Sequence, residues 1–567
     1  MSSSCSLIAQ LAVAQHTQLT IHEAPPEFFG CIFGLNKDLN LSSSDKFRRQ
    51  AKDKSMKSSS RLTNYPAIKN ALLIIEGNGR FSNLELALVV FLVPYLIGKF
   101  FIPFVSVTFL SKAHITLICL LAVPIGVSYW TINSIYGDQI NKLLGLVNTN
   151  SHGEQELPNR SQSSYFVIKD PVLAQKYGSS HSNQKKIPMQ TWHDAHFDGK
   201  IELKRDMLEI LEYRNDWAAF HMTPSLFKYV FTRLIPEVLL HTTSQDEEQV
   251  RDHYDRGDDF YSWFLGPRMI YTCGVISDVN REETLEELQD NKLKLVCQKL
   301  DLNSDDNLLD IGCGWGTLAA FAAKNYGCKV TGVTLGKNQT KFGNERLEAN
   351  GIPTSQGRIV CQDAREIPVE PKGRYTKISC LEMAEHVGIR RYSSFLKQVY
   401  DLLADDGTLV FQVAGIRTNW QYEDLIWGLF MNKYIFPGAD ASLPLGWVIT
   451  KLEQAGFEVK SVDVLGVHYS ATLYRWYKNW QANVDKVKAK YGERWYRIWE
   501  FFLAYSVITS RQGSVSLFQI TLHKNLNTHH RIEGIKSHTS LYSIQQDPSS
   551  NFKTSFDEVV CQTVKNA

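Results

Sequence analysis

The sequence contains no CxxC pair, and its ten cysteines show no paired spacing. Scattered cysteines argue against a disulfide framework and against structural zinc, so we expect reduced thiols in a cytosolic environment and no bound metal. An excess of one charge is also missing, because 61 lysine and arginine residues face 59 aspartate and glutamate residues. The formal net charge of +2 gives no overall electrostatic case for a nucleic-acid partner. The chain also lacks internal repeats and long heptad runs, which excludes solenoid and coiled-coil architectures.

What remains is the composition of a globular chain, with 567 residues of which 44% are hydrophobic and 21% charged. Residues 1–65 are rich in serine and basic side chains, and residues 526–567 show no apolar period, so both ends are predicted to be disordered tails. Residues 137–190 are polar and rich in turn formers, which is typical of a linker. The block over 191–525 is large enough for one enzyme domain with added helices.

Residues 84–136 contain two long apolar runs, Leu84 to Leu110 and Ile115 to Tyr136, separated by the short polar break SKAH. Each run reaches the roughly 20 residues that a helix needs to cross a hydrocarbon core of about 30 Å. We therefore predict a two-helix transmembrane hairpin. Three prolines and Lys99 interrupt the runs, which leaves a buried or interfacial helical hairpin as the alternative. Basic residues precede the first run, and the positive-inside tendency then places both that side and everything after the hairpin in the cytosol.

Strands and helices alternate through the large block. The apolar patterns predict helices over 283–300, 317–326 and 394–407 and from 337 onward, and strands ending at 311 and over 329–335, 377–381 and 408–415. This alternation is typical of an α/β fold with a Rossmann-like, doubly wound parallel sheet. Ligands of such folds bind at the carboxyl ends of the strands.

The stretch LLDIGCGWG, Leu308 to Gly316, follows a predicted strand and opens a predicted helix. Its glycines form GxGxG after Asp310, whereas a dinucleotide-binding turn carries GxGxxG and an acidic ribose ligand about 20 residues on. Thr334 and Leu335 stand where that acidic residue is expected, which counts against NAD. The spacing favours methionine-linked adenosine, a ligand without phosphate. The alternative is a tight strand-to-helix turn that binds nothing.

Further stretches surround the glycine turn. GVTLGKNQ (332–339) and EMAEHVG (382–388) follow it, and HYDRGDDFY (253–261) and RMIYTCG (268–274) precede it. With these motifs the chain resembles the cyclopropane-fatty-acid synthase family of S-adenosylmethionine enzymes, which methylate carbon–carbon double bonds in lipids. The runs WQYEDLIWGLFMNKYIFPGADAS, GVHYSATLYRWYKNW and SRQGS, with the hairpin upstream, are more narrowly similar to the fungal sphingolipid C9-methyltransferases. The resemblance covers roughly residues 65–530 and implies a class I methyltransferase domain.

The resemblance also implies which residues line the S-adenosylmethionine site. They are Tyr271, Thr272, Asp310, Gly312, Cys313, Gly314, Trp315, Gly316, Thr334, Leu335, Gln339, Ala364 and Arg365. Part of this set has a physical reason as well. Thr334 and Gln339 lie between a strand end and a helix start, where their polar groups can meet ribose hydroxyls.

Methylation of an isolated double bond leaves a carbocation, which aromatic faces can stabilise and which must finally lose a proton. In the resembling family the base is a bicarbonate held by cysteine, glutamate, histidine, isoleucine and tyrosine positions. In this chain those positions fall on Cys273, Glu385, Gln412, Ala414 and either Phe502 or Tyr505. We therefore expect catalytic roles for Glu385, Cys273, Gln412 and Tyr505, although no base partner that would make Cys273 a nucleophile is evident.

Three candidates for the base stay open: bicarbonate in a remodelled cage, Glu385 itself, or His386. His386 and His468 are each more typical of satisfied packing residues. The aromatic side chains near the motifs are expected to pack mostly in the core, with one or two beside the reacting carbons; they are Tyr254, Phe260, Tyr261, Trp427, Tyr434, Tyr469 and Trp476.

The resemblance implies methyl transfer from S-adenosylmethionine to C9 of the Δ8-unsaturated sphingoid base of ceramide or glucosylceramide. It also implies an integral protein of the endoplasmic reticulum, with a sphingolipid and the bilayer as partners. A cyclopropane synthase acting on phospholipid acyl chains is the alternative. Intact Asp310, Gln339 and Glu385 disfavour a scaffold without turnover. A nucleic-acid methyltransferase is disfavoured because basic residues concentrate in the N-terminal tail. The oligomeric state stays open.

Overall fold

The computed structural model describes residues 83–101, 108–143, 160–178, 185–234, 236, 257–418, 421–437 and 443–526. The predicted tails, 1–65 and 526–567, lie outside the described residues except for Leu526. The same holds for the first four residues of the HYDRGDDFY stretch, which include Tyr254.

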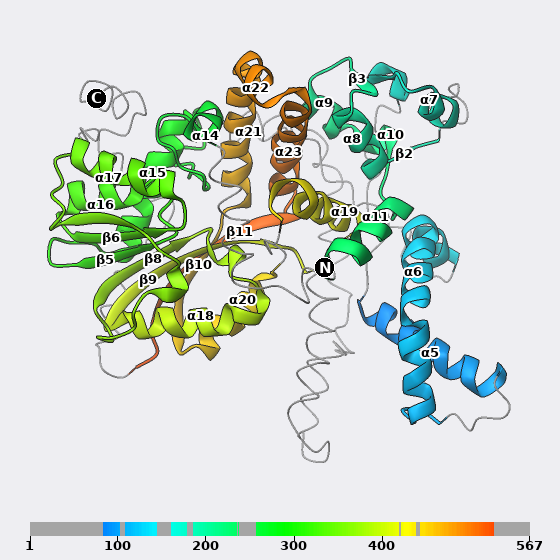
Figure 1. The fold of residues 1–567 in the computed structure, drawn as a ribbon, viewed down its shortest axis with the longest axis horizontal. Coiled ribbons are helices and arrows are strands. Elements are labelled where there is room, and N and C mark those ends of the chain that lie inside the picture. The colour runs from blue at the N-terminus through cyan, green and yellow to red at the C-terminus, as the bar shows by residue number, and fades with distance from the viewer. Residues whose placement is uncertain are drawn as a thin grey trace, which may run out of the picture.

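A seven-stranded sheet forms the centre of the large block, with the strand order β10-β11-β9-β8-β5-β6-β7 (Figure 1). The strands are β5 Asn307–Ile311, β6 Lys329–Thr334, β7 Gly357–Cys361, β8 Tyr375–Leu381, β9 Leu403–Ile416, β10 Phe457–Val464 and β11 Val515–Lys524. The strands β7, β6, β5, β8 and β9 run parallel. The chain order reverses between β5 and β8, and this reversal opens a crevice at their carboxyl ends, where open α/β sheets bind ligands.

The sheet is mixed, which corrects the expectation of an all-parallel sheet. β11 runs antiparallel to both of its neighbours, β9 and β10. Its first residue, Val515, pairs with Ile416 at the end of β9, because only three residues separate β11 from the helix before it. A strand that enters at this end of the sheet must run back along β9.

Helices cover both faces of the sheet (Figure 1). One face carries α15 Leu285–Leu300, α16 Thr317–Tyr326 and α17 Lys337–Ala349, and the other carries α18 Ile389–Leu402 and α20 Leu445–Gln454. The first three match the predicted helices closely, and α15 begins at a capping box formed by Thr284 and Glu287. The helix predicted over 394–407 is displaced to 389–402. Its predicted last turn, Ala404 to Gly407, contains poor helix formers and lies in β9 instead.

A helical layer stands over the carboxyl ends of the strands. It contains α14 Asp258–Leu265, α19 Tyr422–Phe430, η6 Met431–Ile435, α21 Gly466–Ala482, α22 Val484–Tyr491 and α23 Glu493–Arg511. The long helices α21 and α23 pack side by side (Figure 1). Phe260, Tyr261 and Trp476 are buried in this layer, with 0–1% of their surfaces exposed, so they serve the core as expected.

A smaller unit precedes α14 and packs against the helical layer. It contains η2 Gln162–Ser164, β1 Phe166–Ile168, α7 Pro171–Tyr177, β2 Ile187–Pro188, α8 Met189–Phe197, β3 Ile201–Leu203, α9 Met207–Glu212, α10 Arg214–Trp217, β4 Ala218–Ala219, α11 Pro224–Tyr229 and η3 Val230–Leu234. β1 pairs with β3, with 32 residues of chain between the two strands, and Tyr165 is fully buried. The predicted linker over 137–190 therefore contains folded residues, and the folded block begins before 191. Residues 137–190 are rich in turn formers, so their composition did not indicate this small hydrophobic unit.

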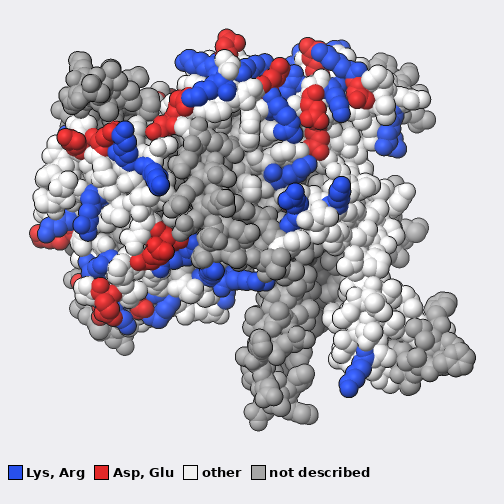
Figure 2. All heavy atoms as spheres, viewed as in Figure 1, with Lys and Arg blue, Asp and Glu red and all other residues white. Residues whose placement is uncertain are grey.

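Both predicted hydrophobic segments are helices, α5 Asn83–Phe101 and α6 Lys112–Leu143, and they pack against each other (Figure 1). The ring of His114 on α6 lies 2.8 Å from the carbonyl oxygen of Phe91 on α5. Within the described residues one stretch, Lys112–Tyr136, is long and apolar enough to cross a membrane. Most of its side chains are exposed or half-buried, and Leu120 is 68% exposed. Figure 2 shows the described surface of both helices almost free of charge.

The candidate active site

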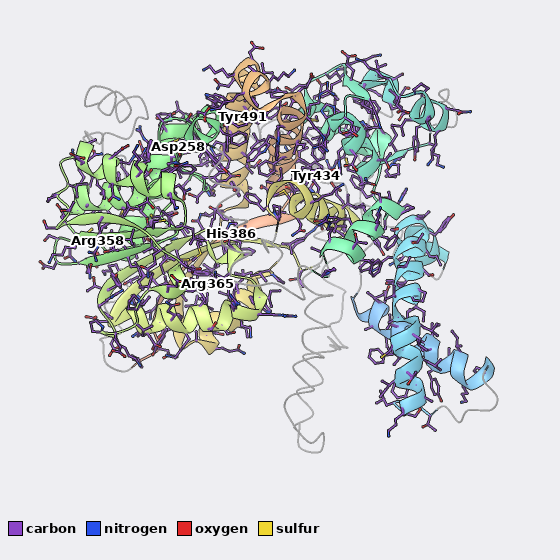
Figure 3. All side chains as sticks on the ribbon, in the orientation of Figure 1. Asp258, Arg358, Arg365, His386, Tyr434 and Tyr491 are labelled. Carbon is purple, nitrogen blue, oxygen red and sulfur yellow. The ribbon has the colours of Figure 1, made fainter. Side chains whose placement is uncertain are left out.

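One cavity opens at the carboxyl ends of β5, β6 and β8, at the reversal of strand order. Twelve of the thirteen residues predicted to bind the cofactor line it: Tyr271, Thr272, Asp310, Gly312, Cys313, Gly314, Trp315, Thr334, Leu335, Gln339, Ala364 and Arg365. Figure 3 shows His386 and Arg365 beside the sheet, and Asp258 on helix α14. Tyr271 and Arg365, which are 94 positions apart in the sequence, thus line the same cavity.

The glycine turn shapes that wall. Gly312 has a φ of +73°, and a Cβ added there would lie 2.6 Å from Cγ of Met383. Gly314, with a φ of +53°, would direct a Cβ into open space. The turn therefore has both a conformation that favours glycine and a free side toward the cavity.

Gly316 is the one predicted cofactor residue that does not line the cavity. A Cβ at this position would lie 3.0 Å from Cα of Gly343 on α17. Gly316 therefore lets two helices approach each other, and the prediction of a ligand contact there is corrected.

Two buried charges face each other in the cavity. Asp310 is 3% exposed and accepts one hydrogen bond, 2.7 Å long, from the hydroxyl of Ser379 on the neighbouring strand. Burial raises the pKa of Asp310 to about 6. Lys292 on α15 is also 3% exposed and donates to the Thr272 hydroxyl at 2.8 Å. Burial lowers the pKa of Lys292, whereas the carboxylates of Glu382 and Asp310 oppose that shift.

The polar groups after β6 are partly bound to each other. The hydroxyl of Thr334 donates to Oε1 of Gln339 at 2.6 Å, and both residues are buried. Arg365 forms a bidentate contact with Asp363, with Nε and Nη2 within 3.0 Å of the carboxylate oxygens. The Gln339 amide nitrogen is left for a ligand, while Thr334 acts mainly by fixing the Gln339 side chain.

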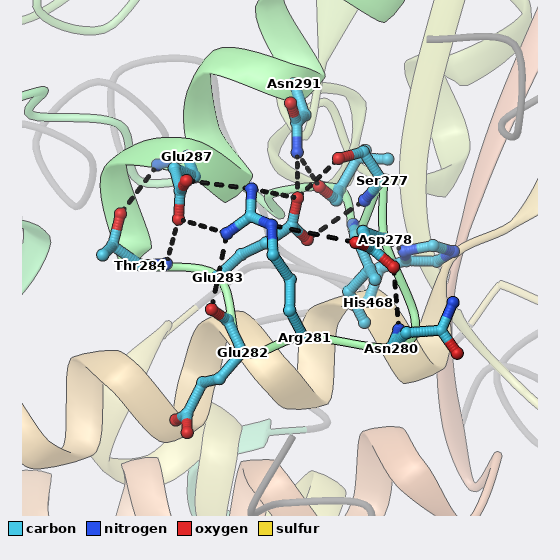
Figure 4. Close-up of polar contacts among 12 residues, drawn as sticks. Ser277, Asp278, Asn280, Arg281, Glu282, Glu283, Thr284, Glu287, Asn291 and His468 are labelled. Carbon is cyan, nitrogen blue, oxygen red and sulfur yellow. Dashed lines mark hydrogen bonds and ion pairs between the residues drawn. The ribbon is translucent and has the colours of Figure 1, made fainter. Parts of the chain in front are cut away.

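A polar network around buried Glu283 and Asn291 holds the segment from Val275 to Ser277 in place (Figure 4). The carboxylate of Glu283, 1% exposed, accepts hydrogen bonds from the Ser277 backbone N–H and from the Asn291 amide. The same Asn291 amide donates to the Val275 carbonyl oxygen at 3.0 Å. His468 accepts a hydrogen bond from the Ile276 backbone, so it is a packing residue as expected. The network anchors one wall of the cavity on α15.

Three of the four predicted catalytic residues cluster at the ends of β8 and β9. Glu385 is 5% exposed, and its Oε1 accepts the Ala414 backbone N–H at 2.5 Å. Burial raises the pKa of Glu385 to about 8, the nearby Glu382 carboxylate adds to the shift, and the Ala414 hydrogen bond opposes it. Burial also raises the pKa of Cys273 far above its usual value, and its Sγ donates to the Gly274 carbonyl, so this thiol is no nucleophile.

Tyr505 does not join this cluster, which corrects the fourth prediction. Its hydroxyl donates to Glu423 at 2.6 Å, and Glu423 forms a buried ion pair with Arg214. This group ties α10 and α23 to α19 and does not line the cavity. The tyrosine beside this cluster is Tyr469 on α21, whose hydroxyl lowers the pKa of Glu382.

Glu382 is the functional residue that the sequence analysis missed. It lies one position beyond the end of β8 and lines the cavity. Its Oε1 accepts the backbone N–H of Cys273 at 2.9 Å and the side-chain amide of Gln412 at 2.6 Å. A usable signal was present, since a carboxylate directly after a parallel strand stands at the ligand-binding edge of the sheet.

The cavity fits S-adenosylmethionine. The carboxylates of buried Asp310 and half-buried Glu382 suit a ligand with positive charge, and desolvation holds the pKa of each above its usual range. The open side of Gly314 lets an extended ligand approach the backbone.

Comparisons with known proteins agree with this assignment. The family model described as mycolic acid cyclopropane synthetase matches residues 241–520. The chain is 55% identical over 482 residues to sphingolipid C9-methyltransferase 2 of Gibberella zeae, covering 85% of this chain and 88% of that protein. It is 54% identical to the sphingolipid C9-methyltransferase of Komagataella phaffii, covering 85% and 96%. The structure of the cyclopropane synthase MmaA2 from Mycobacterium tuberculosis shares 28% identity and a TM-score of 0.46, covering 49% and 98%.

Fold, cavity and family together define a class I S-adenosylmethionine-dependent methyltransferase. Within the cyclopropane synthase family, the chain belongs to the sphingolipid C9-methyltransferases.

Proposed function

We propose that this enzyme methylates C9 of the Δ8-unsaturated sphingoid base of ceramide or glucosylceramide. The observation that carries the proposal is a cofactor cavity that continues into a cluster of buried carboxylates, in a chain with an exposed apolar helix. A cofactor, a proton acceptor and a membrane contact are the three requirements of this reaction on an insoluble alkene. The names of the relatives supply the substrate class.

The proposed cofactor contacts are the twelve predicted residues that line the cavity. Asp310 holds the charged part of the cofactor, and Gln339 binds its ribose with Thr334 as a support. When bound, S-adenosylmethionine supplies a methyl group on a positively charged sulfur. Alignment of the lipid double bond with that methyl group supplies much of the rate, because well-oriented reactants gain on the order of 7 kcal/mol or more. The closed aromatic packing of Tyr271 against Tyr261 and Trp476 excludes water on one side.

We further propose that α5 and α6 form a membrane hairpin that anchors the catalytic block at the cytosolic face of the endoplasmic reticulum. Trp130 on α6 stacks on Phe227 on α11 with ring centroids 6.3 Å apart, so the apolar helix is joined to the folded block. An anchor of this kind keeps the cavity close to a bilayer that contains the substrate.

Mass spectrometry of sphingolipids tests the proposal, in cells with the wild-type chain and with Asp310→Ala in its place. We expect a sphingoid base about 14 mass units heavier, with its double bond retained, to vanish in the variant. Thermal unfolding of the purified variant separates loss of chemistry from loss of folding. Unchanged sphingoid bases in the absence of the protein would overturn the substrate assignment.

The second candidate is a cyclopropane synthase that acts on phospholipid acyl chains, which the description of the matching family model favours. Loss of a proton from the added methyl group closes a cyclopropane, whereas loss from a neighbouring chain carbon leaves a methyl-branched alkene. Disappearance of cyclopropane acyl chains from phospholipids would support this candidate. Product analysis of Gln412→His asks whether this residue helps to select the outcome, and an unchanged product ratio would argue against such a role.

A further inference from the structure

The residues expected to hold a bound anion surround a carboxylate that belongs to the chain itself. The Glu382 side chain accepts the Cys273 backbone N–H at 2.9 Å and the Gln412 amide at 2.6 Å, and the nearby Tyr469 hydroxyl lowers its pKa. Glu385 lies close enough for each carboxylate to influence the other. Cys273, Gln412 and Glu385 are three of the predicted anion-binding positions, and a tyrosine completes the group as predicted, although from a different helix.

The backbone at Glu382 is strained. Its φ is +55°, a left-handed conformation that costs a residue with a side chain roughly 1–2 kcal/mol. The described residues contain three other non-glycine positions of this kind, Leu110, Met269 and Asp301; Met269 also lines the cavity, but Glu382 is the one of them that carries a carboxylate into it. Strain retained at one carboxylate in a cavity points to a role for that side chain.

A row of buried polar side chains fixes the hydrogen-bonding direction at Glu382. Gln412 on β9 pairs directly with Gln519 on β11, and Gln519 donates to the Gln412 oxygen at 2.7 Å. Lys299 on α15 then donates to the Gln519 oxygen at 2.6 Å and to Asp463 on β10. Lys299, Gln519 and Gln412 are all fully buried.

Lysine can only donate, so it sets the direction of both amides. The Gln519 oxygen must face Lys299, its nitrogen must face Gln412, and the Gln412 nitrogen must therefore face Glu382. At the end of the row this arrangement requires an acceptor, which Oε1 of Glu382 supplies. The row thus stabilises charged Glu382 against the cost of burial.

The other candidate bases fit less well. Burial raises the pKa of both carboxylates, but the Cys273 backbone N–H and the Gln412 amide oppose the shift at Glu382. The pKa of Glu385 is raised to about 8, so Glu385 is mostly protonated at neutral pH. Its Oε2 has no hydrogen-bond partner within the described chain, as suits a neutral carboxyl group. His386 lines the cavity and packs edge-on to Phe436 with centroids 6.2 Å apart. A second anion beside Glu382 would meet Glu385 and Asp310 as well, with Lys292 as the one ammonium group among the residues that line the cavity.

We propose that Glu382 is the proton acceptor of this enzyme and takes the position of an exogenous anion, with Gln412, Gln519 and Lys299 as positioning residues. The proposal rests on the proposed function. The alkene π-electrons form the new carbon–carbon bond to the methyl group, and the sulfur keeps the electrons of the broken bond. Glu382 then takes a proton from a chain carbon next to the cation, and the electrons of that C–H bond restore the double bond. The resulting Glu382 carboxylic acid releases its proton to solvent before the next turnover.

Glutamine and glycine variants of Glu382 test the proposal in the full-length protein. Glu382→Gln keeps the size and loses the base, so kcat should fall about 100-fold or more, within the usual range for a general base. The affinity for S-adenosylhomocysteine should change little. Glu500→Gln is the matched control, because Glu500 is also buried and also has a raised pKa but lies on α23 outside the cavity. Its kcat should stay within about twofold.

Glu382→Gly removes the backbone strain and opens the position of the carboxylate. Added bicarbonate should restore part of its turnover and should leave the wild type and Glu382→Gln unchanged. Carbon-13 NMR with labelled bicarbonate gives a readout without turnover: Glu382→Gly should bind the ion and the wild type should not.

Two results would overturn the proposal. One is bicarbonate binding to, or bicarbonate dependence of, the wild type; the other is a Glu382→Gln kcat within a few-fold of the wild type. A wrong sphingolipid substrate would appear differently, as wild-type inactivity on that lipid with the bicarbonate-binding pattern unchanged.

Discussion

The two halves of the cavity hold their polar groups in different ways. The cofactor half is built from short motifs around β5 and β6, where Asp310, Gly312 and Gly314 lie within five residues. The acceptor half draws on separate segments, with Cys273 before α15, Glu382 after β8, Gln412 on β9 and Tyr469 on α21. Local sequence determines the first half, whereas the second exists only when distant strands and helices are assembled.

The halves also differ in charge compensation. Among the described residues Asp310 accepts one side-chain hydrogen bond, from Ser379, whereas Glu382 accepts hydrogen bonds from the Cys273 backbone and the Gln412 amide. A weakly compensated carboxylate gains most from a cationic ligand, and a strongly compensated one is ready to act before the ligand arrives. Cofactor capture and proton removal are thus assigned to different carboxylates.

The largest effect should come from the glycine turn. Gly312→Ala adds a Cβ 2.6 Å from Met383 in a left-handed conformation. Overpacking of about 1–3 kcal/mol and backbone strain of about 1–2 kcal/mol should weaken S-adenosylmethionine binding roughly 100-fold and lower the Tm. Gly314→Ala is the matched control, since its Cβ meets no atom within 4 Å and only the strain remains for folding. Calorimetry measures S-adenosylmethionine binding, and thermal unfolding measures the Tm. An equal loss of Tm in Gly312→Ala and Gly314→Ala would contradict the overpacking at Gly312.

The next effect should come from the far end of the polar row. Lys299→Met frees both glutamine amides to turn, so Glu382 loses a donor to its charged form and its pKa rises. We expect kcat at neutral pH to fall about tenfold, which corresponds to the loss of a hydrogen bond to a charged group. The acidic limb of the pH profile of kcat should move to higher pH.

Lys524→Met controls for the loss of a buried lysine and its ion pair. Lys524 is 4% exposed, lies on β11 and pairs with Asp405 at 3.0 Å, away from the row. Lys524→Met should lower the free energy of unfolding without moving the pH profile of kcat. A profile shifted equally in both variants would remove the positioning role of Lys299.

Glu385 should make stability fall with rising pH. Its pKa is about 8 in the folded protein and near 4.5 when unfolded, so between these values the folded state retains one more proton. The contribution of Glu385 to the free energy of unfolding is therefore complete below pH 4.5 and is lost as pH rises through 8, at about 1.4 kcal/mol per pH unit. Glu385→Gln should flatten this slope in urea unfolding at pH 5, 6.5 and 8 in detergent micelles. Parallel curves for wild type and variant would disprove the shift.

The smallest effect should come from Ser379→Ala, which removes the hydrogen bond to Asp310. The pKa of Asp310, about 6, should rise, because its charged form loses a donor. A rise of about one unit would roughly halve its ionised fraction at pH 7 and weaken S-adenosylmethionine binding about twofold. Calorimetry should show a larger loss of S-adenosylmethionine affinity at pH 6 and almost no loss at pH 8. A loss independent of pH would point to distorted packing instead.

Particular residues show where sequence reasoning succeeded and failed. The strand-turn-helix around Leu308 to Gly316 was predicted because its signal is local, with β5 ending at Ile311 and α16 beginning at Thr317. Tyr505 was misplaced because helix spacing does not tell which tyrosine of α21 or α23 faces the strand ends. Glu382 was overlooked because its role depends on Gln412, 30 positions away.

The sequence by itself determined the methyltransferase class, the glycine turn, most cofactor contacts and the two apolar helices, since each depends on motifs or periodicity within a few turns of chain. Tertiary structure decided the antiparallel β11, the early start of the folded block and the carboxylate cluster. The physical reason is that strand direction, burial and hydrogen-bond partners arise between segments far apart in sequence. The row from Lys299 to Glu382 joins a helix and three strands, and only their packing brings these four side chains into line.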